Sequence, residues 1–177
     1  MIRDTSRITD LVLHCSASPN GRSVPLTEID SWHRARGFKR SVSAINRDPR
    51  RLTSIGYHRV IQPSGAIEQG REFDEVGAHC PRPEDLDGLD QEAAIYPGNS
   101  RSIGLCLVGT DQFTPEQWGA LRGEVQDLMA IFPIVRVWSH HQLTTAKLCP
   151  CFSARDWLAG GMEPMPGHVL GVTAAVG

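Results

Sequence analysis

Short apolar runs recur along the chain, separated by polar and glycine-rich segments. Residues 11–15 and 103–108 are strongly apolar, and residues 134–138 form a third run. Runs of this length predict buried β-strands. The first run reaches His14 and the third leads into His140 and His141, so we expect these histidines at strand ends.

A fourth strand is predicted over residues 57–62, with a return strand over residues 66–69. Pro63, Ser64 and Gly65 lie between them, and all three residue types favour a tight turn. The pattern therefore predicts a β-hairpin in this part of the chain.

Helical periodicity is clearest after Thr114. Residues Thr114, Pro115 and Gln117 form a capping-box pattern with proline at the first helical position. Apolar residues then recur at three- and four-residue spacing up to Pro133, which predicts an amphipathic helix packed on a sheet. These residues are Trp118, Leu121, Val125, Leu128 and Phe132.

Two further helices are predicted on weaker patterns. The first opens at residues 23–25, carries Ile29 and Trp32 on one face, and ends at Gly37. The second is short and covers residues 153–158.

Two long segments, residues 38–54 and 79–99, have no steady hydrophobic period, and we expect both to be loops. A loop as long as the second is usually functional or mobile. The chain after Gly160 is rich in glycine, proline and small apolar residues, which predicts a loosely ordered tail over residues 161–177. The alternation of strands and helices over residues 1–160 predicts a single α/β domain.

Composition agrees with one globular domain: of 177 residues, 40% are apolar and 21% are charged. The formal net charge of −2 argues against a protein that coats DNA, so no nucleic-acid partner is expected. No run approaches the roughly 20 apolar residues of a membrane span, and the first residues lack the apolar segment of a signal peptide. We therefore expect that the protein is synthesised in the cytoplasm and does not insert into a membrane.

Charge is unevenly distributed along the chain. Residues 34–51 carry seven Arg and Lys residues opposed by Asp48, whereas residues 84–92 are acidic. Charged runs of this kind are most often solvated loops.

The five cysteines are Cys15, Cys80, Cys106, Cys149 and Cys151. Their odd number, in a chain long enough to form a full core, favours reduced thiols or metal ligands over a disulfide framework. Cys15 and Cys106 lie in apolar runs and are expected to be buried packing residues.

A catalytic zinc site needs three protein ligands and a fourth position left for water. The candidate ligands are His14, one of His140 and His141, and Cys149. Each also has a plainer interpretation, because a histidine at a strand end is more often a hydrogen-bonded structural residue and a cysteine is often a buried thiol. The sequence lacks the stronger His-Glu-x-x-His and paired Cys-x-x-Cys motifs, so spacing alone leaves both interpretations open.

Several segments occur in an order that is more specific than any one of them. They are Leu13-His14-Cys15-Ser16-Ala17, Gly56-Tyr57-His58, Ala78-His79, residues 99–109, Phe113-Thr114-Pro115-Glu116-Gln117, His140-His141-Gln142-Leu143 and Lys147-Leu148-Cys149-Pro150. Together they closely resemble the zinc-dependent N-acetylmuramoyl-L-alanine amidases of the bacteriophage lysozyme type, relatives of the peptidoglycan recognition proteins. The resemblance covers about residues 11–157 and implies a central mixed, mostly parallel β-sheet flanked by helices.

The resemblance also implies a set of site residues. In that family zinc is held by a histidine after the first core strand, a histidine after the last one and a cysteine before proline, which correspond to His14, His140 and Cys149. Tyr57 and Lys147 match the residues that assist catalysis.

One position of this set depends on how the segments are matched. The chain has one extra residue between His140 and Cys149, and the usual spacing counted back from Cys149 selects His141. We favour His140 because it begins the matching His-x-Gln-Leu pattern.

The function implied by the resemblance is that of a zinc hydrolase that cleaves the amide bond between N-acetylmuramic acid and L-alanine in bacterial peptidoglycan. His79 and Asn99 flank the long polar segment, and we expect them to line a cleft for the stem peptide. An endolysin of this kind acts on the cell wall after release from the cytoplasm, and we expect a monomer. The alternative is a recognition module that binds peptidoglycan without cutting it.

Overall fold

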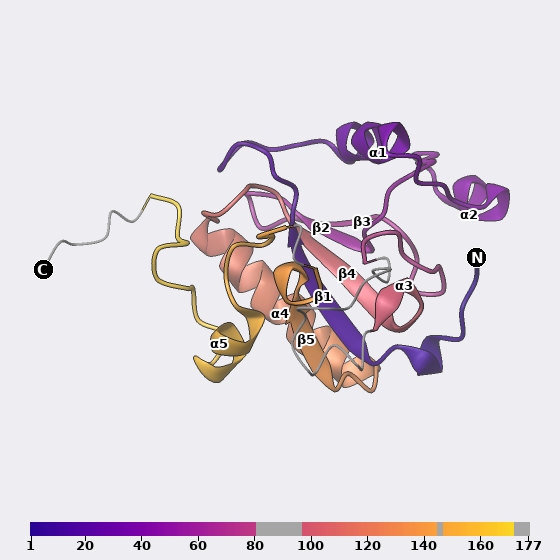
Figure 1. The fold of residues 1–177 in the computed structure, drawn as a ribbon. Coiled ribbons are helices and arrows are strands. Elements are labelled where there is room, and N and C mark those ends of the chain that lie inside the picture. The colour runs from indigo at the N-terminus through magenta and orange to yellow at the C-terminus, as the bar shows by residue number, and fades with distance from the viewer. Residues whose placement is uncertain (81–96, 145–146, 172–177) are drawn as a thin grey trace, which may run out of the picture.

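A five-stranded β-sheet forms the centre of the molecule, with strand order β3-β2-β4-β1-β5 (Figure 1). The computed structural model describes residues 1–80, 97–144 and 147–171. The strands are β1 (Asp10–Cys15), β2 (Arg59–Ile61), β3 (Ile67–Gln69), β4 (Ser102–Leu107) and β5 (Arg136–Ser139).

The sheet is mixed and mostly parallel. Strand β1 lies between β4 and β5 and is parallel to both, β2 is parallel to β4, and β3 is antiparallel to β2. The predicted α/β fold is therefore confirmed, and so is the hairpin formed by β2 and β3. Strand β2 is shorter at both ends than the predicted residues 57–62.

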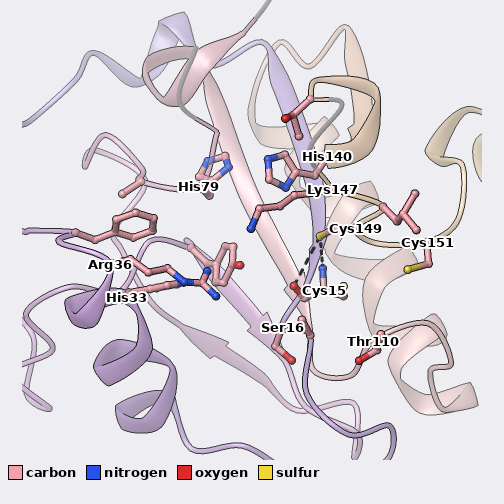
Figure 2. A pocket seen from close by; sticks show the side chains of 16 residues that line it. Cys15, Ser16, His33, Arg36, His79, Thr110, His140, Lys147, Cys149 and Cys151 are labelled. Carbon is pink, nitrogen blue, oxygen red and sulfur yellow. Dashed lines mark hydrogen bonds between the residues drawn. The ribbon is translucent and has the colours of Figure 1, made fainter. Parts of the chain in front are cut away.

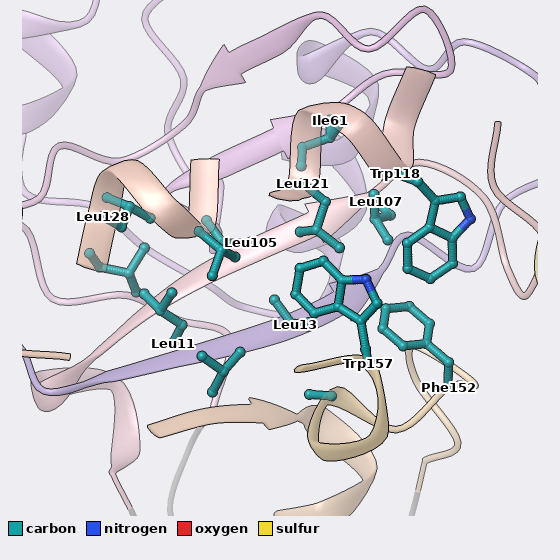
Figure 3. Packing of buried hydrophobic residues seen from close by; sticks show 14 of the residues in the cluster. Leu11, Leu13, Ile61, Leu105, Leu107, Trp118, Leu121, Leu128, Phe152 and Trp157 are labelled. Atoms are coloured by element: carbon teal, nitrogen blue, oxygen red, sulfur yellow. The ribbon is translucent and has the colours of Figure 1, made fainter. Parts of the chain in front are cut away.

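One face of the sheet packs against helices α4 (Pro115–Ile131) and α5 (Ala154–Ala159). Successive side chains of a strand point to opposite faces, so Leu11 and Leu13 of β1 share this face with Leu105 of β4. Figure 3 shows Trp157 close to Leu13 and Trp118 beside Leu107 of β4. Each fully buried side chain of this size stabilises the fold by about 1.5–3 kcal/mol.

The opposite face is covered by helix α1 (Leu26–Ala35). Leu26 and Ile29 of this helix pack in one buried cluster with Val60 and Cys106 of the sheet. His14 belongs to this side of the sheet because it follows Leu13, and it is paired in register with Cys106. The strand pattern thus directs His14 away from the leucine-rich core.

Helix α4 begins and ends as its sequence pattern predicts. The Thr114 hydroxyl accepts a hydrogen bond from the Gln117 backbone N–H at 3.1 Å, and the Gln117 side chain accepts one from the Thr114 N–H at 3.0 Å. The helix ends at Ile131, with Phe132 as its C-cap, directly before Pro133.

The segment expected to be a loop over residues 38–54 contains a helix, α2 (Val42–Arg47). The Ser41 side chain caps it by accepting a hydrogen bond from the Ala44 N–H. A helix of fewer than two turns contains too few positions to show a hydrophobic period, and Ala44 is its one buried residue. The prediction of a plain loop was therefore wrong here.

Other differences from the predicted elements are small. Strand β5 begins at Arg136, two residues later than predicted, and a short 3₁₀ helix, η3 (His140–Gln142), follows it directly. The sequence pattern also missed two short helices, η1 (Thr5–Arg7) and α3 (Gly98–Arg101).

The basic segment is not a solvated loop at Arg40. This side chain is 1% exposed and forms ion pairs with Asp48 at 2.8 Å and Glu75 at 2.7 Å. It also donates a hydrogen bond to the Leu52 carbonyl oxygen. Arg40 therefore joins the segment around α2 to the chain that follows β3.

Part of the segment expected to form a loose tail makes specific contacts. The Phe113 N–H donates to the His168 carbonyl at 2.9 Å, and the Leu170 N–H donates to the Phe113 carbonyl at 2.9 Å. Met162, Met165 and Val169 pack against the main core. Residues 172–177 of the predicted tail, and residues 81–96 with the acidic run, lie outside the described residues.

No helix in the described ranges combines the length and the apolar character that crossing a bilayer requires.

Candidate active site

Two histidines leave the sheet side by side at the carboxyl ends of parallel strands. Leu13 of β1 is paired in register with Ser139 of β5, so the next residues, His14 and His140, emerge together. Their ring centroids are 4.5 Å apart. The carboxyl ends of parallel strands are the usual location of ligand sites in α/β sheets.

A cysteine completes this group from the loop between η3 and α5. The Cys149 Sγ atom lies 4.0 Å from His14 Nδ1, and the ligand atoms of His14, His140 and Cys149 all lie within 4.8 Å of one another. The Cys15 backbone N–H donates to the Cys149 sulfur at 3.0 Å. We call these three residues the His14–His140–Cys149 cluster.

The two adjacent histidines, His140 and His141, occupy different positions relative to the cluster. His140 belongs to the cluster, whereas His141 does not. The His141 backbone N–H instead donates to the Cys149 carbonyl at 2.8 Å and so helps to hold the cysteine loop against η3. The structure therefore favours the matching of segments that selects His140.

His79 lies against His14 rather than at the outer wall of a cleft. The His79 Nδ1 atom is 3.0 Å from His14 Nε2, and the two rings are nearly perpendicular, at 83°. Because this contact uses Nε2 of His14, the Nδ1 atom remains available on the side of Cys149. His79 is 5% exposed and contributes to the lining of the cavity described below.

Asn99 has a different place from the one expected. Its side-chain oxygen accepts hydrogen bonds from the backbone N–H groups of His79 and Cys80, both at 2.8 Å. It is not among the described residues that line the cavity. Because this oxygen is already committed to the backbone, Asn99 orients His79 instead of facing a cleft.

Two glycines make room for the His79 ring. A Cβ atom at Gly104 of β4 would lie 2.6 Å from the ring carbons Cδ2 and Cγ of His79, and one at Gly77 would lie 2.5 Å from Cδ2. Cβ atoms do not approach other atoms so closely. The ring is therefore held between two backbone segments as well as by His14.

Both histidines of the cluster are neutral at neutral pH. Burial lowers the pKa of His14 well below its ordinary value, and the neighbouring imidazoles of His140 and His79 lower it further by electrostatic repulsion of a second positive charge. Burial, assisted by Lys147, lowers the pKa of His140 to about 4. A neutral imidazole offers a nitrogen lone pair, which is the form that binds metal ions.

Cys149 and Tyr57 both retain their protons at neutral pH. Hydrogen bonding to Cys15 and burial raise the pKa of the Cys149 thiol, and burial raises the pKa of the Tyr57 phenol well above its ordinary value. A cation bound beside the sulfur would displace the thiol proton. The Tyr57 phenol keeps its proton and can therefore donate a hydrogen bond.

Two members of the cluster, His140 and Cys149, line a cavity of about 610 Å³ (Figure 2). The third, His14, is buried and is not among the described residues that line it. Tyr57 and Lys147, predicted from the sequence as catalytic residues, both line it. The Tyr57 ring centroid is 5.1 Å from that of His14. Figure 2 shows the exposed Lys147 side chain extending into the cavity beside His140 and Cys149.

Sequence reasoning missed two lining residues at the end of helix α1, His33 and Arg36. The His33 Nδ1 atom accepts a hydrogen bond from the Gly56 N–H at 2.9 Å, and its ring lies 4.9 Å from that of Tyr57. His33 is four residues after Ile29, so its place on the buried face of the helix could have been predicted from spacing. Cys15, expected only to pack, also lines the cavity.

The amino-acid sequence matches a known family over most of its length. Residues 4–152 match the pattern of the N-acetylmuramoyl-L-alanine amidases. This chain belongs to that amidase family. The resemblance read from the sequence motifs is thereby confirmed.

Individual relatives agree with the family. The chain is 30% identical over 157 residues to the endolysin of Enterobacteria phage K11, and the match covers 84% of each chain. Its fold is similar to that of the amidase LysCS, an endolysin from Clostridium intestinale URNW, with a TM-score of 0.65, 20% identity and coverage of 92% of this chain and 88% of that chain.

A second structural relative is a binding protein. The peptidoglycan recognition protein LE, in complex with tracheal cytotoxin, has a TM-score of 0.61 and 15% identity to this chain. The similarity covers 89% of this chain and 83% of that one, and it concerns the fold.

Proposed function

We propose that this protein is a zinc-dependent N-acetylmuramoyl-L-alanine amidase that cleaves the bond between N-acetylmuramic acid and L-alanine in bacterial peptidoglycan. The observation that carries the proposal is the His14–His140–Cys149 cluster in a chain of the amidase family, with His140 and Cys149 lining a cavity. We further propose that the enzyme acts on the cell wall after its release from the cytoplasm, as an endolysin does.

The cluster fits zinc by its chemistry and its dimensions. Two imidazole nitrogens and one thiolate are a ligand set that zinc prefers, and a catalytic site keeps a fourth position open. Tetrahedral zinc, about 2.0–2.3 Å from each ligand, needs ligand atoms roughly 3.5 Å apart. The 4.0 Å separation of His14 Nδ1 from Cys149 Sγ requires a small side-chain rotation to reach this value.

Zinc at this position would lower the pKa of a bound water toward about 7 and would polarise the scissile carbonyl. We propose that Lys147 stabilises the negative charge that develops on the carbonyl oxygen, a role supported by the position of its side chain beside His140 and Cys149. A well-placed donor of this kind contributes roughly 3–4 kcal/mol to the transition state.

Tyr57 is the group that we propose donates a proton to the departing amine of L-alanine. Burial raises the pKa of its phenol, so the proton is present at neutral pH. The ring is held between those of His14 and His33, at 5.1 Å and 4.9 Å. These contacts keep the side chain beside the cluster without a need for substrate.

His79 is proposed to act as a positioning residue. A metal ion on Nδ1 of His14 requires the hydrogen to sit on Nε2, and His79 Nδ1 is 3.0 Å from that atom. A group that hydrogen-bonds the other ring nitrogen of a metal-binding histidine orients the ring and fixes its tautomer. Asn99 supports His79 through the backbone.

The proposal is tested by the products formed from purified peptidoglycan. The wild-type protein should release peptides that begin with a new L-alanine amino terminus, and a chelator should abolish the reaction. Cys149→Ser should lose activity, whereas Cys151→Ser, a matched change on the same loop, should retain it. Mass spectrometry after amino-terminal labelling measures both products and rates.

Other outcomes would identify other functions. New reducing sugar ends would show a glycosidase and contradict the amidase proposal. Equilibrium binding to peptidoglycan without bond cleavage in zinc-containing buffer would identify a recognition module instead.

A further inference from the structure

Among the described residues, the cavity beside the cluster is lined by basic and not by acidic side chains. Two cationic side chains, Arg36 and Lys147, line it, and none of the described residues that line it is Asp or Glu. Lys147 lies next to the cluster, where the proposed reaction uses its charge. Arg36 comes from the opposite wall, at the C-cap of helix α1, and has no role in that reaction.

Arg36 differs from three arginines that follow it in the basic segment. Arg40, Arg47 and Arg50 each form an ion pair with a carboxylate of the protein. For the Arg36 guanidinium, no hydrogen bond or ion pair to any of the described residues is found, and the side chain is exposed. Its charge is therefore available to a ligand.

The direction of the Arg36 side chain supports this interpretation. Figure 2 shows the guanidinium reaching from helix α1 toward the middle of the cavity, past His33. After the larger effect of burial, Arg36 lowers the pKa of His33, and it also acts on the pKa of Tyr57. Its charge thus faces the same space as the reacting groups.

We propose that Arg36 binds a carboxylate of the stem peptide, on the L-alanine side of the scissile amide. The inference rests on the proposed amidase function. The muramic acid side offers hydroxyl and amide groups without charge once its lactyl group is in the amide, so a negative charge in the cavity comes from the peptide. A guanidinium pairs with a carboxylate through two parallel hydrogen bonds, which orients as well as attracts it.

This assignment sets the direction of the substrate. The scissile carbonyl lies at the cluster, and the peptide runs from there across the cavity toward the end of helix α1. Arg36 is then a specificity-determining residue, because it distinguishes substrates by the charge of the peptide and not by the sugar.

The test compares two synthetic substrates, N-acetylmuramoyl-L-alanyl-D-glutamate and the same compound with both carboxyl groups converted to carboxamides. The wild-type zinc enzyme should show a KM about tenfold lower for the carboxylate, since hydrogen bonds to charged groups are typically worth this factor or more. In Arg36→Gln the two KM values should become nearly equal. Arg34→Gln is the matched control, because Arg34 is an exposed arginine of the same helix that does not line the cavity.

The proposal is overturned if Arg36→Gln keeps the wild-type preference for the carboxylate, or if Arg34→Gln loses it equally. If the wild-type protein cleaves neither compound, calorimetric binding of the same two compounds decides the role of Arg36, and the products released from peptidoglycan decide the amidase proposal separately. Tighter binding of the carboxylate that is lost in Arg36→Gln would support the subsite, and equal binding would reject it.

Discussion

His14 offers the cluster one defined ring nitrogen. Its Nε2 atom contacts His79 at 3.0 Å, and its Nδ1 atom is the one that faces Cys149. Burial keeps the ring neutral by lowering its pKa. Two features thus prepare His14 as a ligand. The contact with His79 leaves Nδ1 as the atom that can bind a metal, and burial keeps the ring neutral.

The two adjacent histidines give a direct test of the cluster. We expect His140→Ala to lose bound zinc and His141→Ala to keep about one ion per chain, because a three-ligand site does not tolerate the loss of one ligand. Metal content of the purified proteins by elemental analysis measures this. Circular dichroism of both variants controls for loss of fold, and zinc retained in His140→Ala but lost in His141→Ala would reverse the assignment.

At the scale of elements, parallel pairing produces the site. Because β5 runs parallel to β1, both strands end at the same edge of the sheet, and residues 126 positions apart in the sequence become neighbours. Strand β4 contributes differently, through a missing side chain. Gly104 leaves the space that the His79 ring occupies.

A substitution at Gly104 that fills this space should lower the affinity for metal, although it changes none of the proposed ligands. In Gly104→Ala the new methyl group would displace the His79 ring, and the zinc Kd should rise about 10- to 100-fold, as is typical when a partner of a metal ligand is removed. Competition with a chromophoric chelator measures the Kd.

Gly119→Ala is the control for this substitution, because a Cβ atom at Gly119 in helix α4 meets nothing within 4 Å. That variant should bind zinc as the wild type does and gain up to about 1 kcal/mol in helix stability. A wild-type zinc Kd in Gly104→Ala would show that the His79 ring does not orient His14.

At the scale of the whole molecule, helix α1 forms one wall of the cavity, and the segment that follows it is held by buried ion pairs. Arg40 lies between Asp48 and Glu75, with all three side chains 5% exposed or less. Burial raises the pKa of Asp48, but hydrogen bonds from Arg40 and Arg50 outweigh burial and hold it below its ordinary value.

Removal of Arg40 should therefore be costly in a pH-dependent way. Arg40→Ala removes the buried cation that two buried carboxylates share, and breaking a buried ion pair typically costs about 3–5 kcal/mol at neutral pH. The lowered pKa of Asp48 means that its contribution is present above about pH 4, the unfolded value, and disappears as the pH falls through the folded value. The difference in unfolding free energy between wild type and variant should shrink below about pH 4.

Urea unfolding between neutral and acidic pH measures this difference. Arg47→Ala is the control, because the Arg47–Asp74 pair is 46% and 35% exposed, and surface pairs of this kind contribute little to stability. A difference for Arg40→Ala that stays constant with pH would contradict the proposed role of the buried carboxylates.

Local patterns predicted much of this molecule correctly. The strands at residues 11–15 and 103–108 and the capped helix after Thr114 follow from apolar periodicity and capping, which act between near neighbours. The family motifs also predicted His14, His140 and Cys149 as metal ligands, and the fold brings these three side chains together. The short helix α2 was missed because fewer than two turns carry too little periodic signal.

What the amino-acid sequence determined by itself was the set of elements and the residue types available for chemistry, because both depend on interactions over a few positions. Only the tertiary structure brings His140, and not His141, to His14 and Cys149. It also sets the contact of His79 with His14, the backbone contacts of Asn99 and the direction of Arg36. These features depend on distances between segments far apart along the chain, and strand pairing and packing set those distances only in the folded molecule.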